Sequence, residues 1–145
     1  MNIRSTMLSA MIVLFSLIAL SPSAEGQQNL TKGQVSIAYT NIAVQMKTFA
    51  TALDMYKSDK GSYPKSLSAI YPDYLKSPDN NAVKDKFFDY LPSKDGKSFI
   101  LSFNQGGPPG IQVPAGYPRY DSTKGAVEFM PGIKSLSEFI DKIVP

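Results

Sequence analysis

Residues 31–61, TKGQVSIAYTNIAVQMKTFATALDMYKSDKG, decide the fold of this chain. They open with a capping box, because the hydroxyl of Thr31 can accept from the amide of Gln34 while the Gln34 side chain reaches back. Apolar side chains then recur at spacings of four and three residues, at Val35, Tyr39, Ile42, Met46, Phe49, Leu53 and Tyr56. This is the period of one helix face. Gly61 and the following Pro64 mark its end, so we expect one long helix over about residues 31–60.

After this helix the pattern changes to that of β-strands. Residues 87–91 are rich in aromatic side chains, and Asp95-Gly96 is a hairpin-turn signal. Strict alternation of apolar residues follows over residues 98–103 and again over residues 126–130. We therefore expect three antiparallel strands with one apolar face, which the long helix covers.

Two other segments complete the predicted domain. Residues 104–118, NQGGPPGIQVPAGYP, contain eight glycines and prolines in 15 positions, which indicates a surface loop. Ser135 and Glu138 begin an amphipathic segment that predicts a short helix to about Val144. The expected fold is α+β: a long N-terminal helix packed on a small three-stranded antiparallel sheet, with a short C-terminal helix.

The first 26 residues are typical of a secretory signal peptide. Arg4 precedes the apolar run Met7–Leu20, and small residues over 21–26 permit cleavage after Gly26. The alternative is an uncleaved inner-membrane anchor, because residues 5–24 are 20 positions without a charge. We expect an exported protein, periplasmic or extracellular, with one domain over residues 27–145. Contact with the membrane is expected only through the N-terminal segment, if it stays uncleaved.

The composition disfavours nucleic-acid binding and most catalysis. The 15 basic and 12 acidic residues give a net charge of +3, and the basic residues are spread along the chain. A nucleic-acid surface needs them clustered. The chain has no His and no Cys, so the usual general base, the thiolate nucleophile and the common zinc ligands are missing. We expect a protein that is not an enzyme and that has no cofactor and no bound metal.

Two weak motifs would suggest catalysis or calcium binding instead. Ser62 and Lys65 match S-x-x-K, but Pro64 opposes the helical turn that presents both side chains, and the partner motifs S-D-N and K-T-G are absent. The acidic and amide side chains of residues 79–89 offer oxygens to calcium, but their spacing is not that of an EF-hand, and two lysines intrude. We interpret them as a polar loop: Asp79, Asn81, Asp85 and Asp89.

The end of the helix and the segment after it resemble a known family. Residues 52–64, ALDMYKSDKGSYP, resemble the A-L-x-x-Y-x-x-D-x-G-x-Y-P end of the long helix in type II secretion major pseudopilins and related type IV pilin-like proteins. Residues 71–78, YPDYLKSP, are similar to the L-x-P-x-Y-L-x-x-P segment that follows that helix. The resemblance covers roughly residues 35–103, and it implies a globular head domain with a long helix on a small antiparallel sheet.

Three departures from that family matter. The prepilin leader of the G-F-T-L-x-E type has no counterpart near residues 7–11, and Pro22 interrupts the apolar segment that runs on as one helix in a pseudopilin. Residues 120–125 do not match the acidic, glycine-rich calcium loop of major pseudopilins. The resemblance therefore implies a pilin-like head domain that lacks the prepilin leader, carried on an ordinary export signal.

Two functions follow as hypotheses. The first is a protein that interacts with or chaperones a pilin or secretion-filament component, such as a short pilin or pseudopilin. Its surface is expected on the exposed face of the N-terminal half of the helix and on the Gly/Pro loop: Val35, Ile42, Met46, Ile111, Val113 and Tyr117. The alternative is a periplasmic ligand-binding module with an aromatic cleft lined by Tyr63, Tyr71, Tyr74, Tyr117 and Tyr120. The choice depends on the site, because one fold serves many functions.

Overall fold

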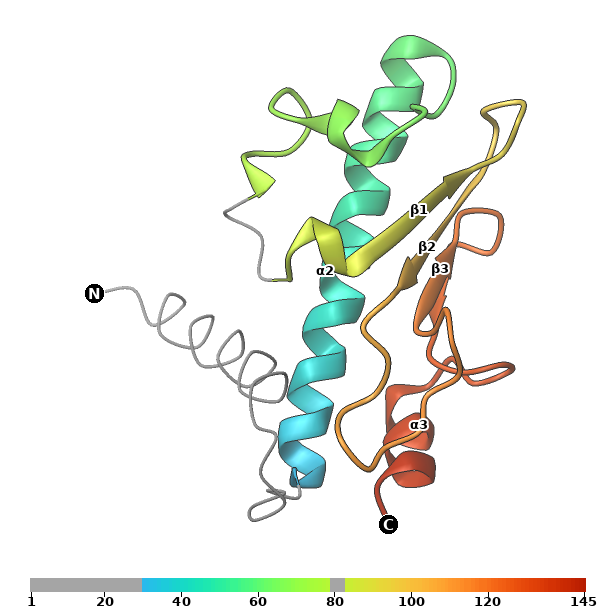
Figure 1. Cartoon of the computed structure of the whole chain (residues 1–145). Coiled ribbons are helices and arrows are strands. Elements are labelled where there is room, and N and C mark those ends of the chain that lie inside the picture. Colours follow the sequence, from blue (N-terminus) through green and yellow to red (C-terminus); the bar gives the residue numbers. More distant parts are fainter. Residues whose placement is uncertain (1–29, 79–82) are drawn as a thin grey trace.

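The computed structural model describes residues 30–78 and 83–145 (Figure 1). The helix α2 (Lys32–Lys60) lies along one side of an antiparallel sheet, and α3 (Leu136–Ile143) closes the chain. Between α2 and the first strand, the described residues include the 3₁₀ turns η1 (Leu67–Ile70) and η3 (Asp85–Phe87). The predicted α+β class, the long helix and the short C-terminal helix are confirmed.

The sheet has four strands, so the prediction of three is wrong. The strands are β1 (Phe88–Pro92), β2 (Phe99–Phe103), β3 (Arg119–Asp121) and β4 (Ala126–Glu128), and they lie in chain order. The missed strand is β3, whose three residues are too short to show alternation. Only Tyr120 among them pairs with core-facing neighbours, Leu101 and Val127.

Some sequence-based predictions concern residues that the structure does not describe. The predicted signal segment, residues 1–26, and the calcium candidates Asp79 and Asn81 lie outside the described residues. Within residues 30–78 and 83–145, no helix combines the length and the apolar character that crossing a bilayer requires.

The helix α2 begins and ends at the predicted caps. Thr31 Oγ1 accepts from the Gln34 amide at 3.2 Å, and Gln34 Oε1 accepts from the Thr31 amide at 2.9 Å. At the other end Gly61 has a φ of 85°, and its amide donates to the Lys57 carbonyl at 2.7 Å. Such a left-handed residue is favourable only for glycine. The caps therefore set both ends of the helix locally, before any tertiary contact.

The predicted apolar face of α2 forms the centre of the core. Tyr56, at its C-terminal end, is only partly buried. The other six side chains are fully buried: Val35, Tyr39, Ile42, Met46, Phe49 and Leu53, each 0% exposed. The sheet covers part of this face, and Phe88 of β1 meets Phe49 edge-on with ring centroids 5.3 Å apart. The N-terminal half is covered by α3, where Phe139 meets Tyr39 at 4.7 Å (Figure 1).

The strand register separates a core face from an outer face. Asp89, Ser102, Arg119 and Glu128 pair across the four strands in one row of the outer face. Leu91, Ile100, Asp121 and Ala126 pair in the next row. Because side chains alternate along a strand, the residues next to these positions in each strand point toward α2. The buried ones among them are Phe88, Phe99, Leu101, Phe103 and Val127.

Two buried tyrosines give a matched stability test. The Tyr39 hydroxyl is buried without a hydrogen-bond partner in the described part of the chain, and this burial raises the pKa of Tyr39 well above its ordinary value. The Tyr63 hydroxyl instead donates to Asp54 Oδ1 at 2.6 Å. We expect Tyr39→Phe to raise the free energy of unfolding by about 1 kcal/mol and Tyr63→Phe to lower it by about 1 kcal/mol. Denaturant unfolding measures both, and an equal loss in the two variants would contradict the prediction.

Candidate functional site

Three of the six predicted partner-binding residues lie inside the domain. Val35, Ile42 and Met46 are each 0% exposed, so the prediction that they form an exposed surface is wrong. The physical reason is α3, which packs on the N-terminal half of α2. The sequence-based prediction assumed that the sheet alone covers α2, and it therefore expected this half of the helix to be exposed.

The exposed apolar surface of α2 is on the opposite side of the helix. Ile37, Val44 and Met55 are 62%, 56% and 51% exposed, and they are three of the four large apolar side chains exposed in the described residues. At 100° per residue, all three point within about 20° of one direction. We call the residues from Ile37 to Met55 that lie within about 40° of that direction the α2 stripe: Ile37, Asn41, Val44, Thr48, Thr51 and Met55. Gly33 and Asp59 point to the same side of α2 beyond the two ends of the stripe.

The α2 stripe carries no charge, and the hydroxyl groups of its threonines are satisfied within the helix. Thr48 Oγ1 donates to the Val44 carbonyl at 2.9 Å, and Thr51 Oγ1 donates to the Lys47 carbonyl at 3.0 Å. A threonine bonded back to its own helix needs no polar group from a partner. The stripe therefore offers an uncharged surface along the helix, in which three large apolar side chains are interspersed with an asparagine and two threonines.

The Gly/Pro loop of residues 104–118, here called the flap, borders a second candidate site. A cavity of about 460 Å³ lies against it, lined by Gly107, Ile111, Gln112, Val113, Pro114 and Met130. Ile111 and Val113 were predicted as binding residues, and both line this cavity. A Cβ at position 107 would clash with the Ile111 carbonyl oxygen, so glycine is required where the flap folds back on itself.

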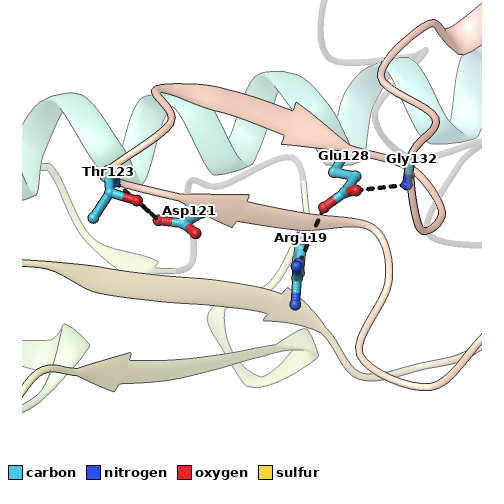
Figure 2. A network of polar contacts seen from close by, with 5 residues as sticks. All are labelled: Arg119, Asp121, Thr123, Glu128 and Gly132. Atoms are coloured by element: carbon cyan, nitrogen blue, oxygen red, sulfur yellow. Dashed lines mark hydrogen bonds and ion pairs between the residues drawn. The ribbon is translucent and has the colours of Figure 1, made fainter.

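A polar network joins β3, which follows the flap, to the turn that carries Met130 (Figure 2). Arg119, the first residue of β3, follows the flap directly, and its Nε lies 3.3 Å from Glu128 Oε2. Glu128 Oε1 accepts a hydrogen bond from the Gly132 amide at 2.7 Å. Glu128 thus joins the end of the flap to the turn that carries Met130. The predicted residue Tyr117 does not line the cavity; its ring lies under the Arg119 guanidinium, 4.9 Å away.

The tyrosines of the predicted aromatic cleft fasten loops to the domain. Tyr63 packs on Phe99 with ring centroids 4.7 Å apart, and Tyr74 donates to Asp59 Oδ2 at 2.9 Å. Tyr71 and Tyr120 are partly buried against the core. Burial raises the pKa of Tyr90 to about 12, and its hydroxyl donates to the Pro64 carbonyl at 2.8 Å. None of the predicted cleft tyrosines is among the described residues that line the flap cavity.

The two weak motifs gain nothing from the structure. Residues 61–65 are not helical, so the turn that would present Ser62 and Lys65 together is not formed. Asp89 Oδ1 accepts from Asn104 Nδ2 at 2.9 Å. Asp79 and Asn81 lie outside the described residues, so the polar loop over residues 79–89 stays a prediction.

Comparison with known proteins adds no identity: no protein-family model, no curated protein and no solved structure matches this chain. The resemblance to pseudopilins therefore stays a prediction, which rests on residues 52–64 and 71–78.

The Glu128 network makes stability depend on pH. The hydrogen bond from the Gly132 amide holds the pKa of Glu128 below its ordinary value, and Arg119 adds to this effect. A carboxylate with a lowered folded-state pKa stabilises the fold above its unfolded-state pKa, and this contribution is lost as the pH falls toward the folded-state value. We expect Glu128→Gln to destabilise the protein near pH 7 and to lose less stability than the wild type on acidification.

Denaturant unfolding of both proteins at a series of pH values measures this difference. The two free energies of unfolding should converge as the pH falls. A gap that stays constant from neutral to acidic pH would show that Glu128 contributes nothing through its charge.

Proposed function

We propose that this chain is an exported, non-enzymatic, pilin-like protein that binds a pilin or secretion-filament component along the α2 stripe. The observation that carries the proposal is the exposure of Ile37, Val44 and Met55 on one uncharged side of a long helix. Exposed apolar residues gathered in this way mark interaction surfaces more often than single ones do.

The shape of the stripe indicates the kind of partner. From Ile37 to Met55 it extends about 27 Å along one helix axis, at 1.5 Å per residue. A narrow, straight, apolar surface of this kind fits the apolar side of another helix. The absence of charge agrees with the depletion of charged residues at the centre of interfaces. The family resemblance supplies the class of partner, since pilins and pseudopilins present a long apolar helix.

Capture in the native host tests this proposal. A photo-crosslinking amino acid at Thr51 should capture a protein with a pilin-like apolar helix. Val44→Glu in the same chain should reduce that capture about tenfold or more, because it forces a charge into the contact. The matched control is Leu91→Glu, since Leu91 is 67% exposed on the outer face of the sheet.

Two outcomes would count against the proposal. One is capture that Val44→Glu leaves unchanged, and the other is a captured protein without any pilin-like helix. Because Val44 and Leu91 are both exposed, neither variant is expected to unfold the domain.

The flap cavity favours a second candidate function, a ligand-binding module. Its volume of about 460 Å³ falls within the range of small-molecule pockets, roughly 300–1,000 Å³. The described lining residues carry no charge, and Gln112 supplies the only polar side chain among them. The ligand class that fits is a small, neutral, mainly apolar molecule.

A neutral fluorescent probe tests this second function. Titration with N-phenyl-1-naphthylamine should raise fluorescence for the wild type, and Val113→Trp should weaken the binding about tenfold by filling the cavity. Leu91→Trp adds the same side chain outside the cavity and should leave binding unchanged. Equal binding by all three proteins would show that the cavity is not the binding site.

A further inference from the structure

We propose that Met55 is a site of reversible sulfur oxidation, which makes the C-terminal end of the α2 stripe polar while the domain stays folded. The inference rests on the proposed function, because it names a chemical step that regulates the contact of that stripe. The oxidation itself is measured on the chain alone, without a partner.

The exposed sulfur of Met55 is the observation that carries this inference. The chain has no Cys, so its sulfur chemistry belongs to methionine. Three methionines lie in residues 30–78 and 83–145: Met55 is 51% exposed, Met46 is 0% exposed, and Met130 is partly buried. An oxidant in solution therefore reaches Met55 directly, whereas it reaches Met46 only when the fold opens locally.

The reaction needs a peroxide, of which hydrogen peroxide is the simplest. The thioether sulfur of Met55 forms a bond to one peroxide oxygen while the O–O bond breaks. The proton on that oxygen passes through solvent to the departing hydroxide, which leaves as water. The sulfur is oxidised to a sulfoxide and the peroxide is reduced. Methionine sulfoxide reductases reverse the step, with a dithiol that becomes a disulfide as the oxygen leaves as water.

The domain tolerates this change at Met55 because the side chain points to solvent. Ile37, Val44 and Met55 share one direction on α2, away from the buried face that Met46 and Leu53 occupy. A sulfoxide oxygen at Met55 is therefore hydrated. The same oxygen at Met46 would be a buried acceptor, which costs stability. Oxidation of Met55 thus alters the surface and leaves the core unchanged.

A sulfoxide at Met55 opposes an apolar contact. Oxidation converts a flexible apolar side chain into a polar one, at one of the three large apolar positions of the stripe. Thr51, the stripe residue one turn before Met55, already donates its hydroxyl to the Lys47 carbonyl at 3.0 Å. The stripe therefore supplies no donor there, and an apolar partner would bury the sulfoxide oxygen without a hydrogen bond. The oxidised chain thus releases the partner, and the reductase restores the contact.

Peptide mapping after exposure to hydrogen peroxide locates the oxidation. Trypsin cleaves after Lys47 and Lys57, so Met46 and Met55 lie on different peptides. In the wild type, Met55 should gain an oxygen about tenfold or more faster than Met46, because Met46 reacts only through opening of the fold. Equal rates at the two positions, or a loss of helical circular dichroism as Met55 reacts, would overturn the inference.

Hydrophobic interaction chromatography tests the change in the surface, and Met55→Leu is the matched control. Leucine keeps an apolar side chain and a similar helix propensity but has no sulfur. Brief exposure to peroxide should shorten the retention of the wild type, and methionine sulfoxide reductase with dithiothreitol should restore it. The retention of Met55→Leu should not change. An equal shift in Met55→Leu would place the oxidation at another residue and overturn the inference.

Capture from a detergent extract of the native host separates this inference from the proposed function. The chain with the photo-crosslinking amino acid at Thr51 is oxidised, freed of peroxide with catalase and added to the extract. Oxidation should reduce capture of the pilin-like protein about tenfold or more, whereas Met55→Leu should keep it. Equal capture by the oxidised and unoxidised wild type would overturn the inference. Absence of capture by the unoxidised chain would instead contradict the proposed function, and the chromatography would still decide whether Met55 is the site of oxidation.

Discussion

The length of α2 is the constraint on which the rest of the structure depends. Its 29 residues extend about 44 Å at 1.5 Å per residue, whereas a strand of five residues spans only about 17 Å. The sheet therefore cannot cover the whole apolar face of the helix. Burial of Tyr39 and Ile42 requires a second element, and α3 provides it through Phe139.

Local signals predicted most of the fold, because they act without tertiary contacts. The caps at Thr31 and Gly61 set the bounds of α2. Strict alternation predicted two of the four strands, and aromatic content with the Asp95-Gly96 turn signal predicted a third. Strand β3 was not predicted because its three residues are too few to show alternation. The exposure of Val35, Ile42 and Met46 was mispredicted for another reason: periodicity shows which side of a helix is apolar but not what covers it. Ile37, Val44 and Met55 were not predicted because Asn41, Thr48 and Thr51 stand at the helical positions between them, so this side of the helix shows no continuous apolar pattern.

The sequence could predict only one wall of the flap cavity. The Gly/Pro composition predicted the loop, and Ile111 and Val113 were chosen from it as binding residues. The opposite wall, Met130, comes from the turn after β4, and only the register of β3 with β4 brings the two together. The Arg119–Glu128–Gly132 network then holds them in place. The register of two short strands leaves no trace in the composition of either segment.

The distribution of charge on α2 differs from that of an ordinary surface helix. A helix on the surface of a globular protein normally carries charged residues on the side away from the core. In α2 the charges lie at the ends or on the flanks, as Lys32, Lys47 and Asp54 do, and none lies on the α2 stripe between Ile37 and Met55. Apolar residues left exposed over this length are costly in water, and the contact proposed for the stripe would remove that cost. A helix with one apolar side in its own core and another suited to a second helix has the composition expected of a subunit that works in contact with others.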